Sequence, residues 1–288
     1  MIKFSIFAAC FTLLLGCHPN RVSVNDFTPE KIFTNGIEGP VYFDNFLYVV
    51  NYQKQGTIGR IDTMGNTELF LEFKNGSIGN SIQVFDKSNL LVADYTNHNL
   101  LKINLLNKEV DIYIHDDRMN QPNDIVIRSD KTIYATDPNW NQNTGQLWMI
   151  TPKKKIALID STMGTTNGIA LSPDESKLYV NESIQRKIWV YDINKNGELH
   201  HKTLFYQFKT GGLDGMKCDV KGNLYVARYG KGKIAVLSPI GKLLREINLK
   251  GINPTNLTFG GKQNKTCYVT MQGRGCVEKF INEYEGRK

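Results

Sequence analysis

The segment VKGNLYVARY, residues 220–229, contains the repeated unit that decides the fold of this chain. Gly222 and Asn223 are turn residues, and the apolar run that follows them favours a β-strand. Similar apolar runs recur along the sequence, at Leu47-Tyr48-Val49, Leu90-Leu91-Val92, Ile133-Tyr134-Ala135, Leu178-Tyr179-Val180, Leu224-Tyr225-Val226 and Cys267-Tyr268-Val269. The central residues of these six runs are spaced 43, 43, 45, 46 and 43 residues apart.

Each repeat contains further short apolar runs that are separated by turn residues. In the repeat centred on Tyr225 these runs are GKIAVLSP at 232–239 and GKLLREINL at 241–249. Four short strands in a unit of about 45 residues are typical of a β-propeller blade. No long segment shows helical periodicity, and a parallel α/β sheet would require helices between its strands. The sequence therefore predicts an all-β fold, a single six-bladed β-propeller with four-stranded blades over residues 27–288.

The last repeat leaves no room for a fourth strand after Phe280. The N-terminal segment around residues 30–34 is available to supply that strand. A strand contributed by the other end of the chain would cover an edge that otherwise exposes unpaired backbone groups. We therefore expect this N-terminal strand to close the ring.

The first residues, MIKFSIFAACFTLLLGCHPN, have the character of a secretion signal. A lysine precedes an apolar stretch that is too short to span a bilayer. Leu14-Leu15-Gly16-Cys17 resembles a bacterial lipobox, which predicts a lipoprotein signal peptide over residues 1–16 and lipidation of Cys17. Residues 17–26 would then be a tether, and the protein a lipid-anchored membrane lipoprotein of the bacterial cell envelope. An ordinary secretion signal is the alternative.

The composition is that of a globular domain able to bury a core, with 41% hydrophobic and 22% charged residues. The formal net charge is +7 and the pI is about 9.0, yet the basic residues are spread out, with one short run at residues 153–155. Nucleic-acid-binding domains usually gather their charge on one surface, so no nucleic-acid partner is predicted. We expect a monomer that acts on a small molecule.

Two cysteines, Cys267 and Cys276, flank an expected hairpin turn. Their offset from the centre of the turn is wrong for directly opposed residues, whereas an oxidising envelope favours disulfides. The sequence leaves open whether they are paired. A third cysteine, Cys218, lies inside an apolar run and is expected in the core.

A polar residue recurs ten to twelve positions before the central residue of each repeat. These six residues are Glu38, Asn80, Asn123, Asn167, Asp214 and Asn256. The first strand of each propeller blade lines the central channel, so residues at the starts of these strands should converge at one end of the channel. The alternative, most relevant to Asn80 and Asn256, is that the side chains bond to the backbone of turns.

Oxygens from two carboxylates and several amides are suitable ligands for a hard cation. Calcium accepts about six to eight oxygen ligands in flexible geometry, whereas magnesium is stricter and retains more water. We therefore expect Ca²⁺, with Mg²⁺ or Mn²⁺ as alternatives, and the absence of histidine from the set disfavours zinc and copper. Without a cation, the two carboxylates would repel each other and one would tend to stay protonated.

Three further acids, Asp94, Asp137 and Glu182, each follow the central residue of a repeat by three positions. We expect them to form salt bridges or to lie near the opposite end of the channel.

Four segments carry a resemblance to a known family: EGPVYF at 38–43, QPNDIVIRSDKTIYATDP at 121–138, TNGIALSPDESKLYV at 166–180 and LDGMKCDVKGNLYVARY at 213–229. In these segments, and in their order and spacing, the chain resembles the gluconolactonase, SMP-30 (regucalcin) and luciferin-regenerating-enzyme family. Squid-type diisopropylfluorophosphatase is a more distant relative. The resemblance covers roughly residues 30–281 and implies a six-bladed propeller with a divalent metal, usually calcium, in the central channel.

The resemblance implies that Glu38, Asn167 and Asp214 are metal ligands and that Asn123 contacts the metal or the substrate. It also implies that Asp214 is the catalytic residue, either as a general acid/base or as a nucleophile. Lactonases of the regucalcin type place a substrate-binding arginine two residues before the equivalent of Asn123, where this chain has Gln121. The nearest arginine is Arg118, which joins Asn123 and Asn80 as a candidate for substrate binding.

These features favour a calcium-dependent hydrolase of lactones or related esters, with phosphotriester hydrolysis on the same metal as a variant. The alternative is a propeller without catalytic activity that binds a protein or carbohydrate partner and holds a structural metal. VADYTNHNLLKIN at 92–104 is similar to an NHL repeat, a type of propeller unit that often binds partners. Only this copy contains the phrase, so a simple turn within a blade also explains its triplet, residues 97–99.

Overall fold

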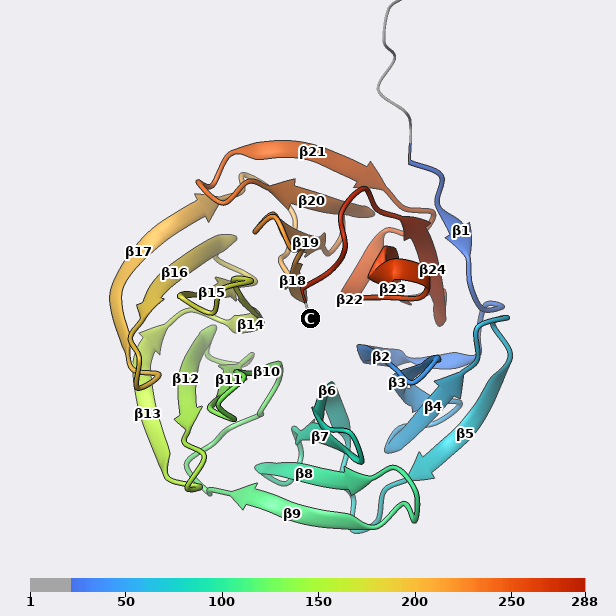
Figure 1. Ribbon diagram of the computed structural model, residues 1–288, viewed down its shortest axis with the longest axis horizontal. Coiled ribbons are helices and arrows are strands. Elements are labelled where there is room, and N and C mark those ends of the chain that lie inside the picture. The colour runs from blue at the N-terminus through green and yellow to red at the C-terminus, as the bar shows by residue number, and fades with distance from the viewer. Residues whose placement is uncertain (1–21, 288) are drawn as a thin grey trace, which may run out of the picture.

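The computed structural model describes residues 22–287, which form six four-stranded antiparallel sheets arranged in a ring (Figure 1). Apart from the short 3₁₀ turn η1, Lys262–Asn264, the elements of these residues are strands. Their bounds are β1 Asn25–Asp26, β2 Phe33–Phe43, β3 Phe46–Tyr52, β4 Thr57–Ile61, β5 Thr67–Glu72, β6 Gly79–Asp86, β7 Asn89–Asp94, β8 Asn99–Asn104, β9 Val110–His115, β10 Ile125–Ile127, β11 Ile133–Asn139, β12 Thr144–Ile150, β13 Ile156–Met163, β14 Thr166–Leu171, β15 Lys177–Glu182, β16 Lys187–Ile193, β17 Leu199–Gln207, β18 Met216–Cys218, β19 Leu224–Arg228, β20 Lys233–Leu237, β21 Leu243–Asn248, β22 Asn253–Gly260, β23 Thr266–Gln272 and β24 Cys276–Ile281.

Five of the six blades consist of four consecutive strands, β2–β5, β6–β9, β10–β13, β14–β17 and β18–β21, and the sixth has the order β1-β24-β23-β22. Figure 1 shows the inner strands nearest the centre of the ring, namely β2, β6, β10, β14, β18 and β22, and β5, β9, β13, β17, β21 and β1 at the rim. Each repeated apolar run lies in the second strand of its blade, as Tyr225 does in β19. The predicted six-bladed propeller with four-stranded blades is confirmed.

The ring is closed by β1, whose Asn25 and Asp26 pair with Lys279 and Glu278 of β24. An N-terminal strand therefore completes the last blade, but it is not the predicted segment around residues 30–34. Residues 27–32 connect the outer edge of the last blade to β2, the inner strand of the first blade, and β2 already begins at Phe33. The chain thus joins the ring at residues that we expected to be the end of a tether.

The hydrophobic core is divided among neighbouring blades. One buried cluster contains Tyr48 and Ile58 of the first blade together with Ile82 and Leu90 of the second, and five similar clusters join the other adjacent blades. The aromatic residue of the repeated run fits this position because its ring packs between two sheets. Each blade is consequently stabilised by its two neighbours, which makes closure of the ring important for all of them.

The cysteines of the last blade are free. In the β23–β24 pair, Cys267 lies opposite Phe280 and Cys276 lies opposite Met271, so the two thiols are not neighbours. Both are buried, as is Cys218. The disulfide between Cys267 and Cys276 that the sequence left open is therefore absent from the structure.

The predicted signal peptide, the lipidation site Cys17 and the first part of the tether lie outside the described residues. Within residues 22–287, no helix has the length and hydrophobicity needed to cross a membrane.

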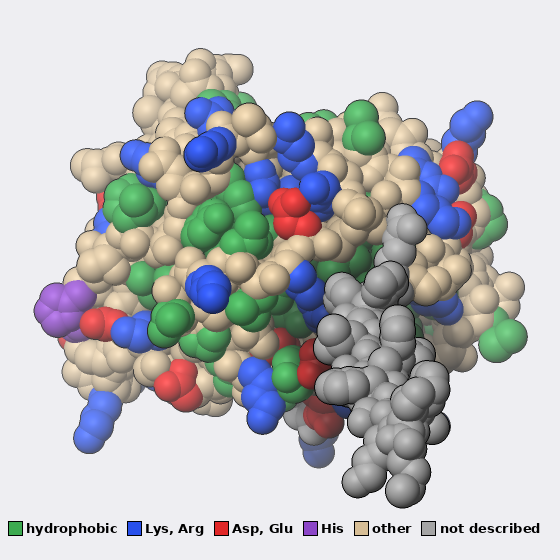
Figure 2. All heavy atoms as spheres, turned by 90° about the horizontal axis from the view of Figure 1, so that it is seen from above, with side chains coloured by type: hydrophobic (Ala, Val, Ile, Leu, Met, Phe, Trp, Pro, Cys, Tyr) green, Lys and Arg blue, Asp and Glu red, His purple; other side chains and the backbone are tan. Residues whose placement is uncertain are grey.

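The rim of the disc exposes a mixed surface. Figure 2 shows one part of it, on which hydrophobic side chains lie exposed among Lys, Arg, Asp and Glu. The outer strands contribute such residues, for example Leu204 of β17 and Leu244 of β21, which are both about half exposed. Single exposed apolar residues are common on globular proteins and carry no functional meaning by themselves.

Arg274 connects the two ends of the chain at the point of closure. Its guanidinium donates to Asp26 at 2.9 Å, to Glu30 at 2.6 Å and to Glu278 at 2.5 Å. The Glu278 side chain is completely buried and also accepts the backbone N–H groups of residues 250 and 251, both at 2.9 Å. The ion pair between Arg274 and Glu278 thus lies inside the structure, where removal of one partner is costly.

We predict that Arg274→Met lowers the free energy of unfolding by about 3–5 kcal/mol, because it leaves the buried Glu278 carboxylate without its counter-ion. Lys54→Met is the matched control, since it removes an ion pair with Glu72 in which both side chains are more than half exposed. Such an exposed pair contributes up to about 1 kcal/mol. Urea unfolding of both variants measures the difference, and equal losses of stability would contradict the prediction.

Candidate active site

Four of the six recurrent polar residues lie within two residues of the start of an inner strand, whereas Glu38 and Asn256 lie further along β2 and β22. Glu38 and Asn80 are in β2 and β6, Asn167 is in β14, and Asp214 precedes β18 by two residues. The inner strands run through the ring in the same sense, so their starts share one end of the channel, which we call the ligand end. The predicted convergence is therefore a consequence of the fold.

The backbone around Asp214 is held closely against the neighbouring inner strand. Its N–H donates to the carbonyl of Ala227 at 3.0 Å, and its own carbonyl accepts the amide of Asn181 at 2.6 Å. A Cβ atom at Gly168 would lie 2.2 Å from the same carbonyl oxygen. The glycine of the TNG motif is thus required for the close approach that places Asn167 beside Asp214.

Glu38 and Asp214 form a buried pair of carboxyl groups. Their side chains lie close enough for each to shift the pKa of the other, and Asn167 lies close enough to lower the pKa of Asp214. Glu38 Oε2 also accepts the N–H of Gly39 at 2.7 Å and the amide of Asn256 at 3.0 Å. Four of the six predicted positions (38, 167, 214 and 256) therefore lie together at this end of the channel.

Both acids of this pair favour the protonated form when no cation is present. Burial raises the pKa of Glu38 to about 7, while the bonds from Gly39 and Asn256 act in the opposite direction. Burial also raises the pKa of Asp214 well above its usual range, and the neighbouring Glu38 adds to this effect. Two carboxyl groups in a common buried site cannot both ionise at low cost unless a positive charge lies between them.

Asp124 is a third acid near this pair, and sequence reasoning missed it. It is buried, accepts the hydroxyl of Ser81 at 2.6 Å and the N–H of Ile125 at 3.0 Å, and its charge acts on both Glu38 and Asp214. It directly follows Asn123 in the PND motif. The PND motif contains Asp124, but only the asparagine of this motif falls at the position that recurs in all six repeats.

Within the described structure, the side-chain oxygen of Asn123 is unpaired, as expected of a metal ligand. Its Oδ1 is buried and has no hydrogen-bond partner among residues 22–287, although buried polar atoms are nearly always paired. Its backbone carbonyl accepts the amide of Asn80 at 3.3 Å, which places Asn80 beside it. The unpaired amide oxygen and the two carboxylates together fit a hard cation, the chemistry predicted from the sequence.

The candidate metal ligands include side-chain amides as well as carboxylates. Among residues 22–287, no group of three or more His, Cys, Asp and Glu side chains is placed to hold a metal ion. A cation here would bind Glu38 and Asp214 together with the amide oxygens of Asn123 and Asn167. Such all-oxygen sites suit calcium better than zinc or copper.

Arg118 is placed differently from the other predicted residues. Its guanidinium donates twice to Asp116, at 2.8 and 2.5 Å, and lies 5.3 Å from the ring centre of Trp148. The side chain is 65% exposed. Within residues 22–287 it forms neither a hydrogen bond nor an ion pair with Glu38 or Asp214. Its role in substrate binding stays a prediction.

The three acids that follow the repeated runs lie at the ligand end, so their predicted placement at the opposite end is wrong. Glu182 lies directly opposite Thr166, the first residue of β14, and its carboxylate accepts the N–H of Gly164 at 2.9 Å. Asp94 accepts the N–H of Ile78 at 3.1 Å, and Asp137 accepts those of residues 120 and 121. These carboxylates bond to backbone before the inner strands rather than to basic side chains.

The comparisons with known proteins agree with this geometry. The family model for the SMP-30/gluconolactonase/LRE-like region matches residues 37–273. The chain belongs to this family. The match includes Glu38, Asn123, Asn167 and Asp214, so the whole candidate site lies inside the family region.

Named relatives are similar at low identity. The gluconolactonase of Zymomonas mobilis is 27% identical over 66% of this chain, and the chain spans 60% of that protein. The diisopropyl-fluorophosphatase of Loligo vulgaris is 28% identical over 90% of this chain and 95% of its own length. Among solved structures, a regucalcin from Agrobacterium tumefaciens, described as a calcium-binding protein, superimposes with a TM-score of 0.82 at 16% identity. That alignment covers 93% of this chain and 96% of the other, and it shows the shared fold.

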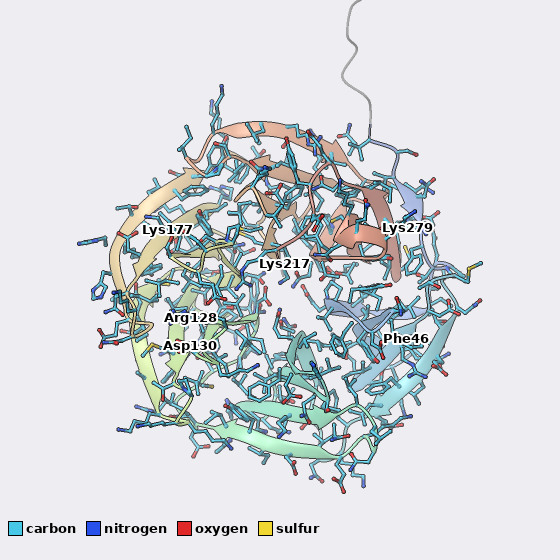
Figure 3. All side chains as sticks on the ribbon, viewed as in Figure 1. Phe46, Arg128, Asp130, Lys177, Lys217 and Lys279 are labelled. Carbon is cyan, nitrogen blue, oxygen red and sulfur yellow. The ribbon has the colours of Figure 1, made fainter. Side chains whose placement is uncertain are left out.

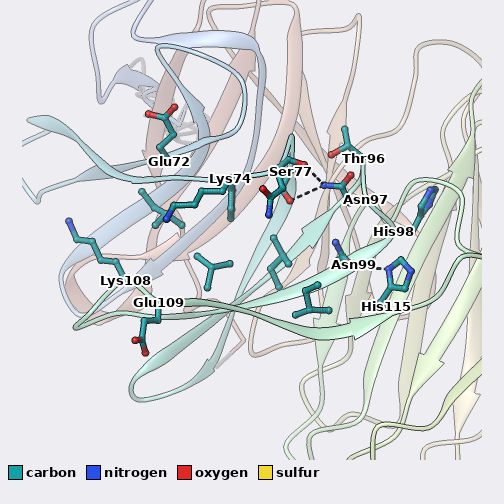
Figure 4. A pocket seen from close by; sticks show the side chains of 16 residues that line it. Glu72, Lys74, Ser77, Thr96, Asn97, His98, Asn99, Lys108, Glu109 and His115 are labelled. Atoms are coloured by element: carbon teal, nitrogen blue, oxygen red, sulfur yellow. Dashed lines mark hydrogen bonds between the residues drawn. The ribbon is translucent and has the colours of Figure 1, made fainter.

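The NHL-like triplet covers the end of the turn between β7 and β8, residues 97 and 98, and the first residue of β8, Asn99, in agreement with the alternative interpretation as a turn within a blade. It lines a surface groove of about 900 Å³ between the first two blades (Figure 4). Asn97 donates to the hydroxyl of Ser77 at 3.0 Å, and Asn99 Oδ1 lies 2.8 Å from His115 Nδ1. These bonds hold the turn, so the triplet has a structural role within this member of the family.

We predict that the protein without metal becomes less stable as the pH rises from about 4.5 to about 7. In this window folded Glu38, with a pKa of about 7, holds a proton that the unfolded chain, with a pKa near 4.5, has lost. The folded state binds more protons, so the free energy of unfolding falls as pH increases. Calcium removes this loss because it replaces the proton, and its stabilising effect should be larger at pH 8 than at pH 5.

Thermal unfolding with EDTA and with calcium, at several pH values, measures this effect. Glu38→Gln removes one of the two titrating acids and should weaken the pH dependence of the protein in EDTA, with the remaining dependence due to Asp214. A stabilisation by calcium that is equal at pH 5 and pH 8 in the unmodified protein would count against the pair as the metal site.

Proposed function

We propose that the protein is a calcium-dependent hydrolase of lactones or related esters, with its active site at the ligand end of the channel. The observation that carries the proposal is the buried pair of Glu38 and Asp214, together with the unpaired Asn123 oxygen at the same end of the channel. A structural pair would be expected to end in a counter-ion or in a complete set of hydrogen bonds. The relatives named gluconolactonase and diisopropyl-fluorophosphatase support hydrolysis at such a site.

Calcium would be held by Glu38, Asn123, Asn167 and Asp214, and when bound it supplies a Lewis acid that polarises the carbonyl oxygen of the substrate. Mg²⁺ and Mn²⁺ are the alternative cations. Glu38 is oriented for this role by the N–H of Gly39 and the amide of Asn256, which both bond to Oε2. Asn167 lowers the pKa of Asp214 and so favours its carboxylate form.

Asp214 is the catalytic residue in this proposal. Its carboxylate accepts a proton from water as the water oxygen attacks the carbonyl carbon of the ester. The bond between that carbon and the ring oxygen then breaks, and the proton passes to the departing alkoxide, so that one water is consumed and a hydroxy acid is formed. The hydrogen bonds to the backbone of Asp214 hold it in position for both proton transfers.

Specificity would come from the loops at the ligand end, which connect the rim of one blade to the centre of the next. The loop between β9 and β10, residues 116–124, is the longest of these loops and contains Arg118, Gln121 and Asn123. Since Gln121 stands where regucalcin-type lactonases have arginine, we propose a substrate that lacks the anionic or sugar group such an arginine would bind. Asn80 and Asn123 remain the candidates for substrate hydrogen bonds.

We predict that Asp214→Asn reduces kcat by about 10²-fold or more while leaving measurable calcium binding, because the amide keeps an oxygen ligand but cannot take a proton. Asp111→Asn, on the exposed strand β9, is the matched control and should keep full activity. Sugar lactones, aliphatic lactones and aryl esters are offered with calcium and with chelator.

Turnover that disappears with chelator and in Asp214→Asn supports the proposed mechanism. Full hydrolytic activity of Asp214→Asn rules it out. Calcium-dependent stabilisation without turnover of any substrate would instead favour the binding propeller that the NHL-like turn suggested.

We also propose that Cys17 is lipidated and anchors the protein to a membrane of the bacterial envelope, as the lipobox-like sequence indicates. The full chain, expressed in a bacterium, should incorporate labelled fatty acid and sediment with membranes. Cys17→Ser should abolish both properties, whereas Cys10→Ser, within the apolar stretch, should retain them. Labelling that persists in Cys17→Ser contradicts this assignment.

A further inference from the structure

A second cavity of about 590 Å³ opens at the end of the channel opposite to the ligand end. Its lining includes the last residues of several inner strands, such as Phe43 of β2, Leu171 of β14 and Cys218 of β18. Four or five residues of extended chain separate these from Glu38, Asn167 and Asp214, which corresponds to roughly 15 Å. We call this space the far cavity, and the hydrolytic mechanism does not use it.

The wall of the far cavity combines apolar and cationic side chains. Val41, Phe43, Val84 and Ile127 contribute apolar surface from three blades. Four basic residues join them, namely Arg128, Lys131, Lys217 and Arg287, whereas Glu175 is the one acid among the described lining residues. The volume is within the range of about 300–1,000 Å³ that is usual for small-molecule sites.

Most of these charges are already paired within the protein. Glu175 accepts Arg287 at 2.5 Å and the hydroxyl of Ser129 at 2.8 Å. Arg128 pairs with Asp130 at 2.8 Å, and the ammonium of Lys131 donates to the carbonyl of Phe85. The acids near the cavity are therefore committed to other partners.

Lys217 is different from the other three cations. Its ammonium group has no hydrogen bond or ion pair with any residue between 22 and 287, although the residue is only partly exposed. It is the middle residue of β18, and Figure 3 shows it at the inner edge of the ring, facing the centre. A cation directed into a partly enclosed, mainly apolar space attracts an anion more strongly than one in open water.

The C-terminal segment forms part of the same wall. Figure 1 shows the chain after β24 running inward to the centre of the ring. Arg287 N donates to the carbonyl of Cys218 at 2.9 Å, and Gly286 forms an isolated bridge with Asp219. Gly286 packs so closely on Phe259 that a Cβ atom would lie 2.2 Å from it. The segment thus narrows the far cavity and fixes Arg287 beside it.

We propose that the far cavity binds a small organic anion, whose carboxylate or similar charged group pairs with Lys217 and whose apolar body lies against Val41, Phe43 and Ile127. The apolar wall excludes a bare inorganic ion as the best ligand, because such an ion would lose its hydration without sufficient hydrogen bonds in return. A neutral apolar molecule would leave the charge of Lys217 uncompensated. The combination of both surfaces therefore selects an amphiphilic anion.

Isothermal titration of octanoate into the purified protein tests this proposal. The buffer contains EDTA, so that the carboxylate cannot bind through calcium at the ligand end. We expect binding that is weakened at least tenfold in Lys217→Ala and weakened when the salt concentration rises. Lys217→Arg keeps the charge and should retain binding. Octan-1-ol, which has the same chain without the charge, should bind at least tenfold more weakly than octanoate.

Two controls locate the binding. Lys102→Ala, on the third strand of the second blade and outside the cavity lining, should bind octanoate like the unmodified protein. Asp214→Asn should also bind it equally in EDTA, because the ligand end is not involved. Thermal unfolding shows that each variant is folded.

The proposal is overturned if octanoate does not bind, or binds equally to Lys217→Ala. It is also overturned if inorganic phosphate binds as tightly as octanoate, since the apolar wall would then contribute nothing. None of these outcomes depends on calcium or on lactone turnover, so failure here and failure of the proposed hydrolase activity are distinguishable.

Discussion

The contact between Glu38 and Asp214 is the interaction on which the functional part of the structure depends. Glu38 belongs to the first blade and Asp214 to the start of the fifth, so the two acids meet only when the ring has closed. Burying two like-charged groups costs several kcal/mol per ion unless protons or a cation compensate them. The large clusters between blades supply the stability that tolerates this cost.

The ring closure is itself built from charges that are fully compensated. Arg274 brings Asp26, Glu30 and Glu278 together, and Glu278 receives two backbone N–H groups in addition. This buried acid and the buried acids at the ligand end are therefore opposite cases. Glu278 has a counter-ion in Arg274, whereas Glu38 and Asp214 have none among residues 22–287. That difference separates a structural carboxylate from a candidate ligand.

The direction of the ligands is set by the second strands of the blades as well as by the inner ones. In five blades, the residue three positions after the central residue bonds to backbone of the inner strand or of the loop before it. These residues are Asn51, Asp94, Asp137, Glu182 and Arg228. Acid, amide and guanidinium all serve, because each can satisfy a backbone group that the loop leaves unpaired. The second strands consequently hold the loops at the ligand end in place, and these loops position the starts of the inner strands.

The fold was predictable because each blade is a local unit whose turns and strands can be recognised within about 45 residues. The convergence of Glu38, Asn167 and Asp214 followed from the same repeat, since equivalent positions in equivalent strands share one end of the channel. Asp124 was not predictable in this way. Strand alternation would point it away from Asn123, but both precede β10 in irregular backbone, where alternation does not apply.

The closing strand and the far cavity depend on contacts between distant segments, which no local pattern reports. Asn25 and Asp26 form only a two-residue strand, so their propensity carries little information and their partner β24 decides the pairing. In the same way, the sequence around Lys217 shows only a polar residue in a short strand, and its surroundings are formed by five other inner strands.

Because all inner strands run in the same direction, the two ends of the channel differ in their side chains. Residues at the strand starts gather carboxylates at the ligand end, and residues at or beyond the strand ends gather cations at the other. At a separation of roughly 15 Å, unit charges at the two ends attract each other by about 1 kcal/mol at an effective dielectric constant of 20, and less once salt screens them. The two ends are therefore nearly independent electrostatically, and the short segment 214–218 contributes Asp214 to one site and Lys217, in β18, to the other.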